Sequence, residues 1–196
     1  MAPQKNISAE FLFEISWEVC NKVGGIHTVV ASKAYNLREE LGDRHILIGP
    51  DVWRDVDDNP EFIEDPAMFR SWKSVAVPDG LRVKTGRWNI RGNPIVILID
   101  FSSLIPKKDE ILSSLWESYR LDSLHGRWDY IESLLFGIAA GKVIESFVSF
   151  HLPSNKKSIA QFHEWMTGAG ILWLKKRPVR VATVFTPHAT VLGRSL

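Results

Sequence analysis

Residues 11–49 constrain the fold of this chain more than any other segment. The stretch Phe11–Ile15 reads FLFEI, short and mostly apolar like a buried strand, and it leads to paired glycines at Gly24 and Gly25. Apolar residues then recur at helical spacing, at Val29, Val30, Ala34, Leu37 and Leu41. Gly42 supplies a helix stop, and His45–Ile48 is a second strand. This strand–turn–helix–strand unit is the repeating element of a parallel α/β sheet.

The middle of the chain has further β-like stretches. Residues 72–77 and 81–88 flank the turn sequence Pro78–Gly80, and we expect them to form an inserted β-hairpin. Residues 95–99 read IVILI, which is apolar throughout, as in a strand buried on both faces. Residues 51–66 are acidic and broken by prolines, which indicates an excursion at the strand ends.

The second half of the chain alternates helix and strand patterns. We expect helices over residues 109–119 and 129–150, strands over 158–162 and 180–185, and the start of another helix near Ala189. The predicted fold class is therefore α/β, with a parallel sheet, helices on both of its faces and an inserted hairpin.

Size and charge exclude several classes of protein. The 196 residues suffice for one sizeable core, so residues 1–196 are treated as one domain. The net charge of +1 gives no electrostatic case for binding nucleic acid or an anionic membrane. The apolar run at 131–150 carries charged residues and is interpreted as too polar for a membrane span.

The beginning of the chain and its cysteine content suggest a cytoplasmic setting. The N-terminus lacks the apolar run of a signal peptide, and Cys20, the only cysteine, cannot form an internal disulfide. Cys20 is either a reactive thiol beside the glycine turn or a small buried core residue.

Polar clusters follow three of the predicted strands at their carboxyl ends, where open parallel sheets bind ligands. The first is Lys22 with the glycines at 24 and 25. Paired glycines let a backbone approach a ligand, and a helix N-terminus with a lysine beside it suits a phosphate; a plain tight turn is equally compatible. The segment matches neither the dinucleotide-binding nor the P-loop pattern.

The second cluster is His163–Trp165. A histidine and a carboxylate suit hydrogen bonds with sugar hydroxyls, whereas the alternative is that Glu164 caps the following helix. The sequence HEWMT resembles a zinc motif, but Thr167 stands where the second histidine is needed, so we expect no metal.

The third cluster holds His188 and Arg194. The planar fork of an arginine suits phosphate, and a helix beginning near Ala189 would bring both side chains toward one edge. A capping histidine and a surface arginine explain the same spacing.

Three segments together resemble one family, glycogen synthases of the animal and fungal type. They are FEISWEVCNKVGGIHTV at 13–29, FHEWMTG at 162–168 and VATVFTPHATVLGR at 181–194, in family order across nearly the whole chain. The match is weak over 51–125. Pro187 departs from the family pattern, where a threonine is expected, and we expect it to reshape the loop while leaving His188 in place.

The resemblance implies the first Rossmann-like half of a GT-B glycosyltransferase, which transfers glucose with retention to the 4-hydroxyl at the non-reducing end of a glucan. It implies that Lys22, Gly24, Gly25 and Arg194 face the donor nucleotide and that His188 contacts the donor glucose. Glu164 and His163 would border the substrate pocket, with His188 and Glu164 as the catalytic pair. The donor is expected to be UDP-glucose, and neither a metal nor another cofactor is expected.

The partners implied are a sugar nucleotide, an α-glucan and a second Rossmann domain, and homo-oligomeric assembly of the full-length enzyme is left open. The chain stops inside a strand–helix unit, so we interpret it as a fragment; a small complete protein with an unusual tail is the alternative. Two other functions stay open: an ADP-glucose-dependent synthase of the bacterial and plant type, which carries Lys-Thr-Gly-Gly where this chain has Lys-Val-Gly-Gly, and a non-catalytic glycan-binding module.

Overall fold

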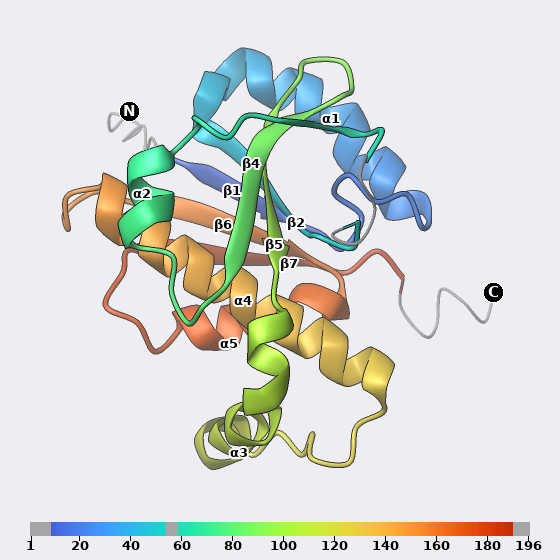
Figure 1. Ribbon diagram of the computed structural model, residues 1–196, viewed down its shortest axis with the longest axis vertical. Coiled ribbons are helices and arrows are strands. Elements are labelled where there is room, and N and C mark those ends of the chain that lie inside the picture. The colour runs from blue at the N-terminus through green and yellow to red at the C-terminus, as the bar shows by residue number, and fades with distance from the viewer. Residues whose placement is uncertain (1–8, 54–58, 190–196) are drawn as a thin grey trace, which may run out of the picture.

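A seven-stranded sheet runs through the computed structural model, which describes residues 9–53 and 59–189 (Figure 1). The strands are β1 (Leu12–Ile15), β2 (His45–Pro50), β3 (Phe62–Glu64), β4 (Arg82–Trp88), β5 (Ile95–Asp100), β6 (Ser158–His163) and β7 (Val181–Thr186). The helices are α1 (Gly25–Leu41), α2 (Arg70–Val75), α3 (Lys108–Tyr119), α4 (Trp128–His151) and α5 (Ala169–Leu174). Short 3-10 turns occupy Gly42–Arg44, Ser102–Lys107 and Trp165–Thr167.

The sheet has the order β3-β4-β5-β2-β1-β6-β7. Neighbours from β5 to β7 are all parallel, so the predicted parallel α/β core is confirmed. β4 is antiparallel to both β3 and β5, which makes the sheet mixed at that edge. The apolar stretch predicted as a strand buried on both faces is β5, and each of its residues is buried.

The hairpin predicted around Pro78–Gly80 is wrong. Residues 70–75 form helix α2, and the antiparallel partners of β4 are β3 and β5. The reason is the spacing of apolar side chains: Phe69, Trp72 and Ala76 recur at helical intervals and pack together against the core. Trp72 is completely buried, and its indole N–H donates to Ser146 Oγ on α4 at 2.9 Å.

The two faces of the sheet are covered differently. Helix α1 lies on one side and α4 with α5 on the other (Figure 1), as predicted. The α4 side is the larger apolar core, where Phe13 and Ile15 of β1 meet Phe136 and Phe147. The α1 side holds a smaller apolar cluster around Val30. Next to it lies a polar layer, made of Glu14 with His45, His163 and Lys33, which belongs to the candidate site.

Helix α4 is long and apolar enough to cross a membrane by length and composition, contrary to the expectation from its charged residues. Within the fold, however, 72% of its most apolar window is buried. This burial is what a central core helix shows, and it explains why α4 is apolar nearly all round.

Candidate active site

The carboxyl ends of β1, β6 and β7 lie side by side and gather most of the predicted polar residues. Ile15 of β1 pairs with Phe162 of β6, and His163 of β6 pairs with Thr186 of β7. The segment after each strand therefore emerges at the same edge of the sheet. His163, Glu164 and His188 meet there, as their positions after neighbouring strands predicted.

Glu164 holds the loop that follows β7. Its Oε1 accepts hydrogen bonds from the backbone N–H groups of His188 and Ala189, both at 2.7 Å. Burial would raise the pKa of Glu164, but these N–H groups and that of Trp165 outweigh it and lower the pKa. Glu164 is thus an ionised clamp on the loop, and through the Trp165 N–H it also caps the 3-10 turn as the alternative interpretation expected.

The backbone of Glu164 is strained. Its φ of 64° and ψ of 168° lie in a region that is essentially reserved for glycine. Such strain costs about 1–3 kcal/mol and persists where the surrounding structure imposes it, often at a functional site. The structure therefore points independently to this turn.

His163 and His188 form a hydrogen-bonded pair. His163 Nδ1 lies 2.7 Å from His188 Nε2, and the two rings are nearly stacked, with centroids 5.0 Å apart. His163 is buried, and its other nitrogen, Nε2, lies 2.7 Å from Glu14 Oε1. Both ring nitrogens of His163 are thus engaged inside the protein, so it supports His188 and offers no free nitrogen to a ligand.

His188 is the half-exposed member of the pair. Burial, and after it the neighbouring His163, lower the pKa of His188, so its imidazole is neutral at neutral pH. Because Nε2 of His188 is engaged with His163, its Nδ1 is the ring nitrogen that can form a hydrogen bond with a hydroxyl group.

Glu14 is the centre of the polar layer under α1, and sequence reasoning missed it. It is fully buried in the middle of β1, where Oε2 lies 3.0 Å from His45 Nε2 and Oε1 also forms an ion pair with Lys33 of α1. Burial alone would raise the pKa of Glu14, but His163, His45 and Lys33 lower it to about 2. The signal was present: a carboxylate inside the apolar strand sequence FLFEI needs buried partners.

The glycine turn opens α1 as predicted, but a second unpredicted residue occupies part of the helix N-terminus. Glu18 is buried, and its Oε2 accepts from the N–H groups of Gly24 at 2.7 Å and His27 at 3.0 Å. A phosphate at this end of α1 would be left with the first-turn N–H groups of Gly25 and its neighbour. A Cβ added to Gly25 would meet no atom of the described residues within 4 Å.

Cys20 and Lys22 both precede this turn, and they differ in solvent accessibility. Lys22 is exposed, while Cys20 is buried with 1% of its surface accessible, and burial raises the pKa of its thiol. Cys20 is therefore the small core residue of the two interpretations, not a reactive thiol. Arg194 and the helix expected after Ala189 lie outside the described residues.

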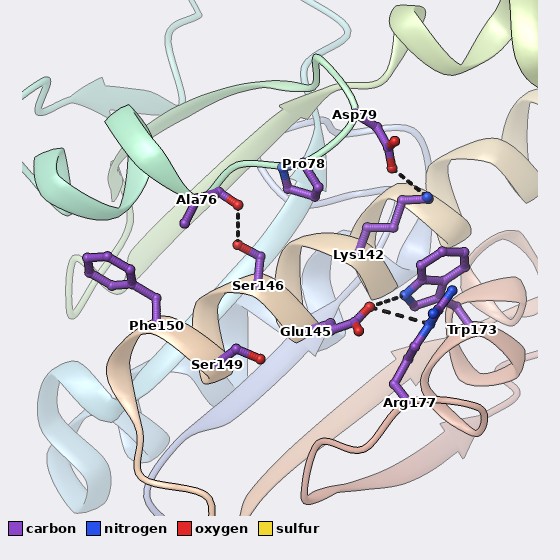
Figure 2. Close-up of a pocket in the computed structure, with 10 residues that line it drawn as sticks. All are labelled: Ala76, Pro78, Asp79, Lys142, Glu145, Ser146, Ser149, Phe150, Trp173 and Arg177. Carbon is purple, nitrogen blue, oxygen red and sulfur yellow. Dashed lines mark hydrogen bonds and ion pairs between the residues drawn. The ribbon is translucent and has the colours of Figure 1, made fainter.

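A large hollow lies away from the strand ends. Figure 2 shows a hollow of about 590 Å³ between α4, the end of α5 and the segment after α2, on the α4 side of the sheet. Trp173 lies there under Lys142 Nζ and Arg177 Cζ, 3.9 and 3.8 Å from its ring centroid, and its indole N–H donates to Glu145 at 2.7 Å. The charged residues of the hollow are paired, Lys142 with Asp79 and Arg177 with Glu145, and none of the residues gathered at the strand ends lines it.

Among residues 9–53 and 59–189, no three His, Cys, Asp or Glu side chains are grouped so that they could hold a metal ion.

The fold and the polar edge define an α/β domain whose ligand site is expected beyond the carboxyl ends of its parallel strands. The family model described as "Glycogen synthase" matches residues 14–196, and the chain belongs to the glycogen synthase family.

Relatives come from animals and an amoeba. The chain is 40% identical over 187 residues to the liver glycogen [starch] synthase of Rattus norvegicus, a match that covers 94% of this chain and 26% of that protein. It is 37% identical to the glycogen [starch] synthase of Caenorhabditis elegans, covering 95% of this chain and 28% of the relative. It is 36% identical to the glycogen [starch] synthase of Dictyostelium discoideum, a match that covers 98% of this chain and 22% of that protein. The chain thus spans about a quarter of the length of these curated relatives.

Proposed function

We propose that residues 1–196 are the N-terminal Rossmann-like domain of a retaining GT-B glycosyltransferase. The enzyme would transfer glucose from UDP-glucose to the non-reducing 4-hydroxyl of an α-1,4-glucan, with a second Rossmann domain completing the site. The family and the names of the relatives support this reaction class. The structural observation that supports it most is the neutral His188, held at the sheet edge by His163 and by the Glu164 clamp.

The proposed roles follow from chemistry. His188 orients the donor glucose through a hydroxyl hydrogen bond, which counts most in a transition state of oxocarbenium character. Glu164 borders the pocket and fixes the loop that presents His188. Lys22, Gly25 and Arg194 face the nucleotide diphosphate, and Gly24 lets the backbone approach it although its own N–H donates to Glu18. These basic groups and the N-terminus of α1 would stabilise the negative charge of the diphosphate, which a metal ion does in other transferases. The proposal therefore includes no metal and no cofactor.

A chimera tests the proposal. This chain replaces the matching quarter of the rat liver enzyme, and glucose incorporation into glycogen is measured with UDP-glucose and with ADP-glucose. We expect His188→Ala to lower turnover strongly, and His188→Gln to restore part of it because an amide can still donate and accept. His151→Ala is the matched control, since His151 is an exposed histidine at the far end of α4. Equal turnover in the His188 and His151 variants would remove His188 from the site.

The same assay separates the alternatives. A preference for ADP-glucose would favour the bacterial and plant type of synthase. A chimera that binds glycogen, retains its fold and transfers no glucose would favour a glycan-binding module. The 196-residue chain alone is expected to be inactive, because the reacting groups must be positioned from both halves.

Arg194 provides a second, independent prediction. Arg194→Ala in the chimera should weaken donor use by about 1.5–3 kcal/mol in kcat/KM, the range for a charge-assisted hydrogen bond. Lys157→Ala, an exposed cation at the opposite ends of the strands, is the control. Unchanged donor kinetics in the Arg194 variant would leave it as a surface residue.

We place the enzyme in the cytoplasm, with a sugar nucleotide and glycogen as its partners and with a homo-oligomeric assembly as a further proposal. The buried free thiol of Cys20 is compatible with a reducing compartment.

A further inference from the structure

We propose that Glu14 is a positioning residue: through His163 it determines which nitrogen of His188 holds the proton, so that His188 presents an unprotonated Nδ1 at the site. The use of that nitrogen toward donor glucose rests on the proposed function. The proton arrangement itself depends only on the polar layer under α1.

The first step is the place of Glu14. In β1 the side chains of Phe13 and Ile15 enter the apolar core on the α4 side, so Glu14 points to the α1 side. No part of Glu14 is exposed, yet it is ionised, and a buried carboxylate needs hydrogen-bond donors on both oxygens. The structure supplies them from three elements: His45 of β2, His163 of β6 and Lys33 of α1.

The second step is the charge balance. Lys33 supplies one positive charge against the single negative charge of Glu14, so the buried group is neutral when both histidines are neutral. Lys33 also contacts Gln161 Oε1 at 3.4 Å, and Gln161 Nε2 donates to Thr186 Oγ1 at 2.9 Å, so neither neighbour adds a charge. The next carboxylate, Glu164, is directed to backbone N–H groups of the loop.

The third step is the direction of the hydrogen bonds. A carboxylate only accepts, so His45 and His163 each donate from Nε2–H. His45 Nδ1 is buried and has no partner among the described residues, which suits a lone pair better than an N–H group. His163 Nδ1 then carries a lone pair as well, and it can only accept from His188 Nε2–H. The remaining nitrogen of His188, Nδ1, is left unprotonated.

The consequence is a fixed polarity at the site. His188 becomes a hydrogen-bond acceptor toward a hydroxyl group, whereas the opposite arrangement would make it a donor. The opposite arrangement requires a proton on both nitrogens of His163, which then donates to His188 Nε2 and leaves Nδ1–H on His188. The two arrangements place different protons on the same rings, so they are distinguishable.

Nuclear magnetic resonance of the ¹⁵N-labelled 196-residue chain at neutral pH tests the inference directly. Long-range ¹H–¹⁵N spectra report which imidazole nitrogens are protonated, and His163→Gln and His188→Gln assign the two rings. We expect one dominant neutral tautomer with Nε2–H on both His163 and His188. A doubly protonated His163, or Nδ1–H on His188, would overturn the inference without any further variant.

A double variant tests the role of Glu14. Glu14→Leu with Lys33→Met removes both charges together, so no unpaired ion stays buried. We expect the ratio of the two His163 tautomers to fall by roughly tenfold or more, as for the loss of a charge-assisted hydrogen bond, and the His188 ratio to follow. His45→Gln is the matched control, because His45 contacts the other oxygen of Glu14 and should leave both ratios unchanged. Unchanged ratios in a folded double variant would overturn the role of Glu14.

Activity is measured separately in the chimera. If His188 has the proposed role, the double variant lowers kcat more than it raises KM for the donor. A shifted tautomer with unchanged kcat would support the proton arrangement and contradict the use of His188 toward donor glucose. Failure of the proposed function is therefore distinguishable from failure of the inference.

Discussion

At the scale of single residues, the candidate site is built on a conflict between side chain and backbone at Glu164. The carboxylate is needed to accept from the N–H groups of His188 and Ala189, but the backbone angles of this position favour glycine. A glycine would relieve the strain and release the loop. The hydrogen bonds of the carboxylate with the loop after β7 therefore explain why a glutamate stands at this strained position.

The strain at Glu164 is measurable by a pair of variants. Both Glu164→Ala and Glu164→Gly lose the carboxylate, so their difference reports the backbone alone. We expect the alanine variant to be less stable than the glycine variant by about 1–3 kcal/mol in urea unfolding of the chain. At Glu132 inside α4 the same pair should show the reverse order by about 1 kcal/mol, as in an ordinary helix. The same order at both positions would mean that Glu164 is unstrained.

Which residues could be predicted depended on whether the strand pattern alone placed them together. Parallel pairing brings the carboxyl ends of neighbouring strands to one edge of the sheet. At these ends lie His163, Glu164 and His188. Glu14 acts on partners that only the folded chain brings near, whereas Glu18 accepts from Gly24 and His27 only a few residues away, through a turn whose shape the spacing does not reveal. The buried carboxylate in FLFEI was a visible sign that something must pair with it, though the sequence does not identify His45 or Lys33 as that partner.

At the scale of elements, α4 and α5 cross unusually closely. A Cβ added to Gly170 of α5 would lie 2.6 Å from the carbonyl oxygen of Gly137 on α4 and 2.5 Å from a ring carbon of Phe162 on β6. The absence of a side chain at Gly170 thus allows α5 to approach both α4 and the strand that ends at His163. This contact supports the turn that holds Glu164.

Gly170→Ala should therefore destabilise the chain by about 1–3 kcal/mol, the usual cost of overpacking a core. Gly25→Ala is the matched control. It also lies in the first turn of a helix, but a Cβ there meets no atom within 4 Å in the described part of the chain, so alanine should be neutral or stabilising by up to about 1 kcal/mol. Chemical unfolding of the two variants measures the difference. Equal stability would show that the α4–α5 contact can relax at little cost.

Element prediction succeeded where one periodicity dominated and failed where two competed. Residues 95–99 and 129–150 have unambiguous apolar patterns and became β5 and α4. Residues 72–77 contain aromatic and β-branched residues that favour a strand, but burial of Trp72 against α4 favours one short helix. Tertiary packing thus determines the secondary structure of this segment, and a local sequence pattern carries no information on that packing.

At the scale of the whole molecule, one sheet separates two different environments. On the α4 side the packing is apolar and aromatic. On the α1 side a buried carboxylate, a lysine and histidines are held together by hydrogen bonds. The parallel sheet was predictable from the sequence, but this asymmetry was not, because it depends on which face each strand residue points to.

The polar side should make the chain sensitive to acid. The pKa of Glu14 falls from 4.5 to about 2 on folding, so its contribution is fully present above about pH 4.5 and is lost as the pH falls toward 2. A shift of this size corresponds to about 3 kcal/mol of unfolding free energy. We expect the urea-unfolding free energy of the wild-type chain to fall steeply between about pH 4.5 and 2, and that of Glu14→Leu with Lys33→Met to fall less. Lys33→Met alone retains Glu14 and both histidine contacts, so it should keep most of the wild-type slope. If the wild type and the double variant lost stability in parallel across this range, the buried carboxylate would not be what ties the fold to pH.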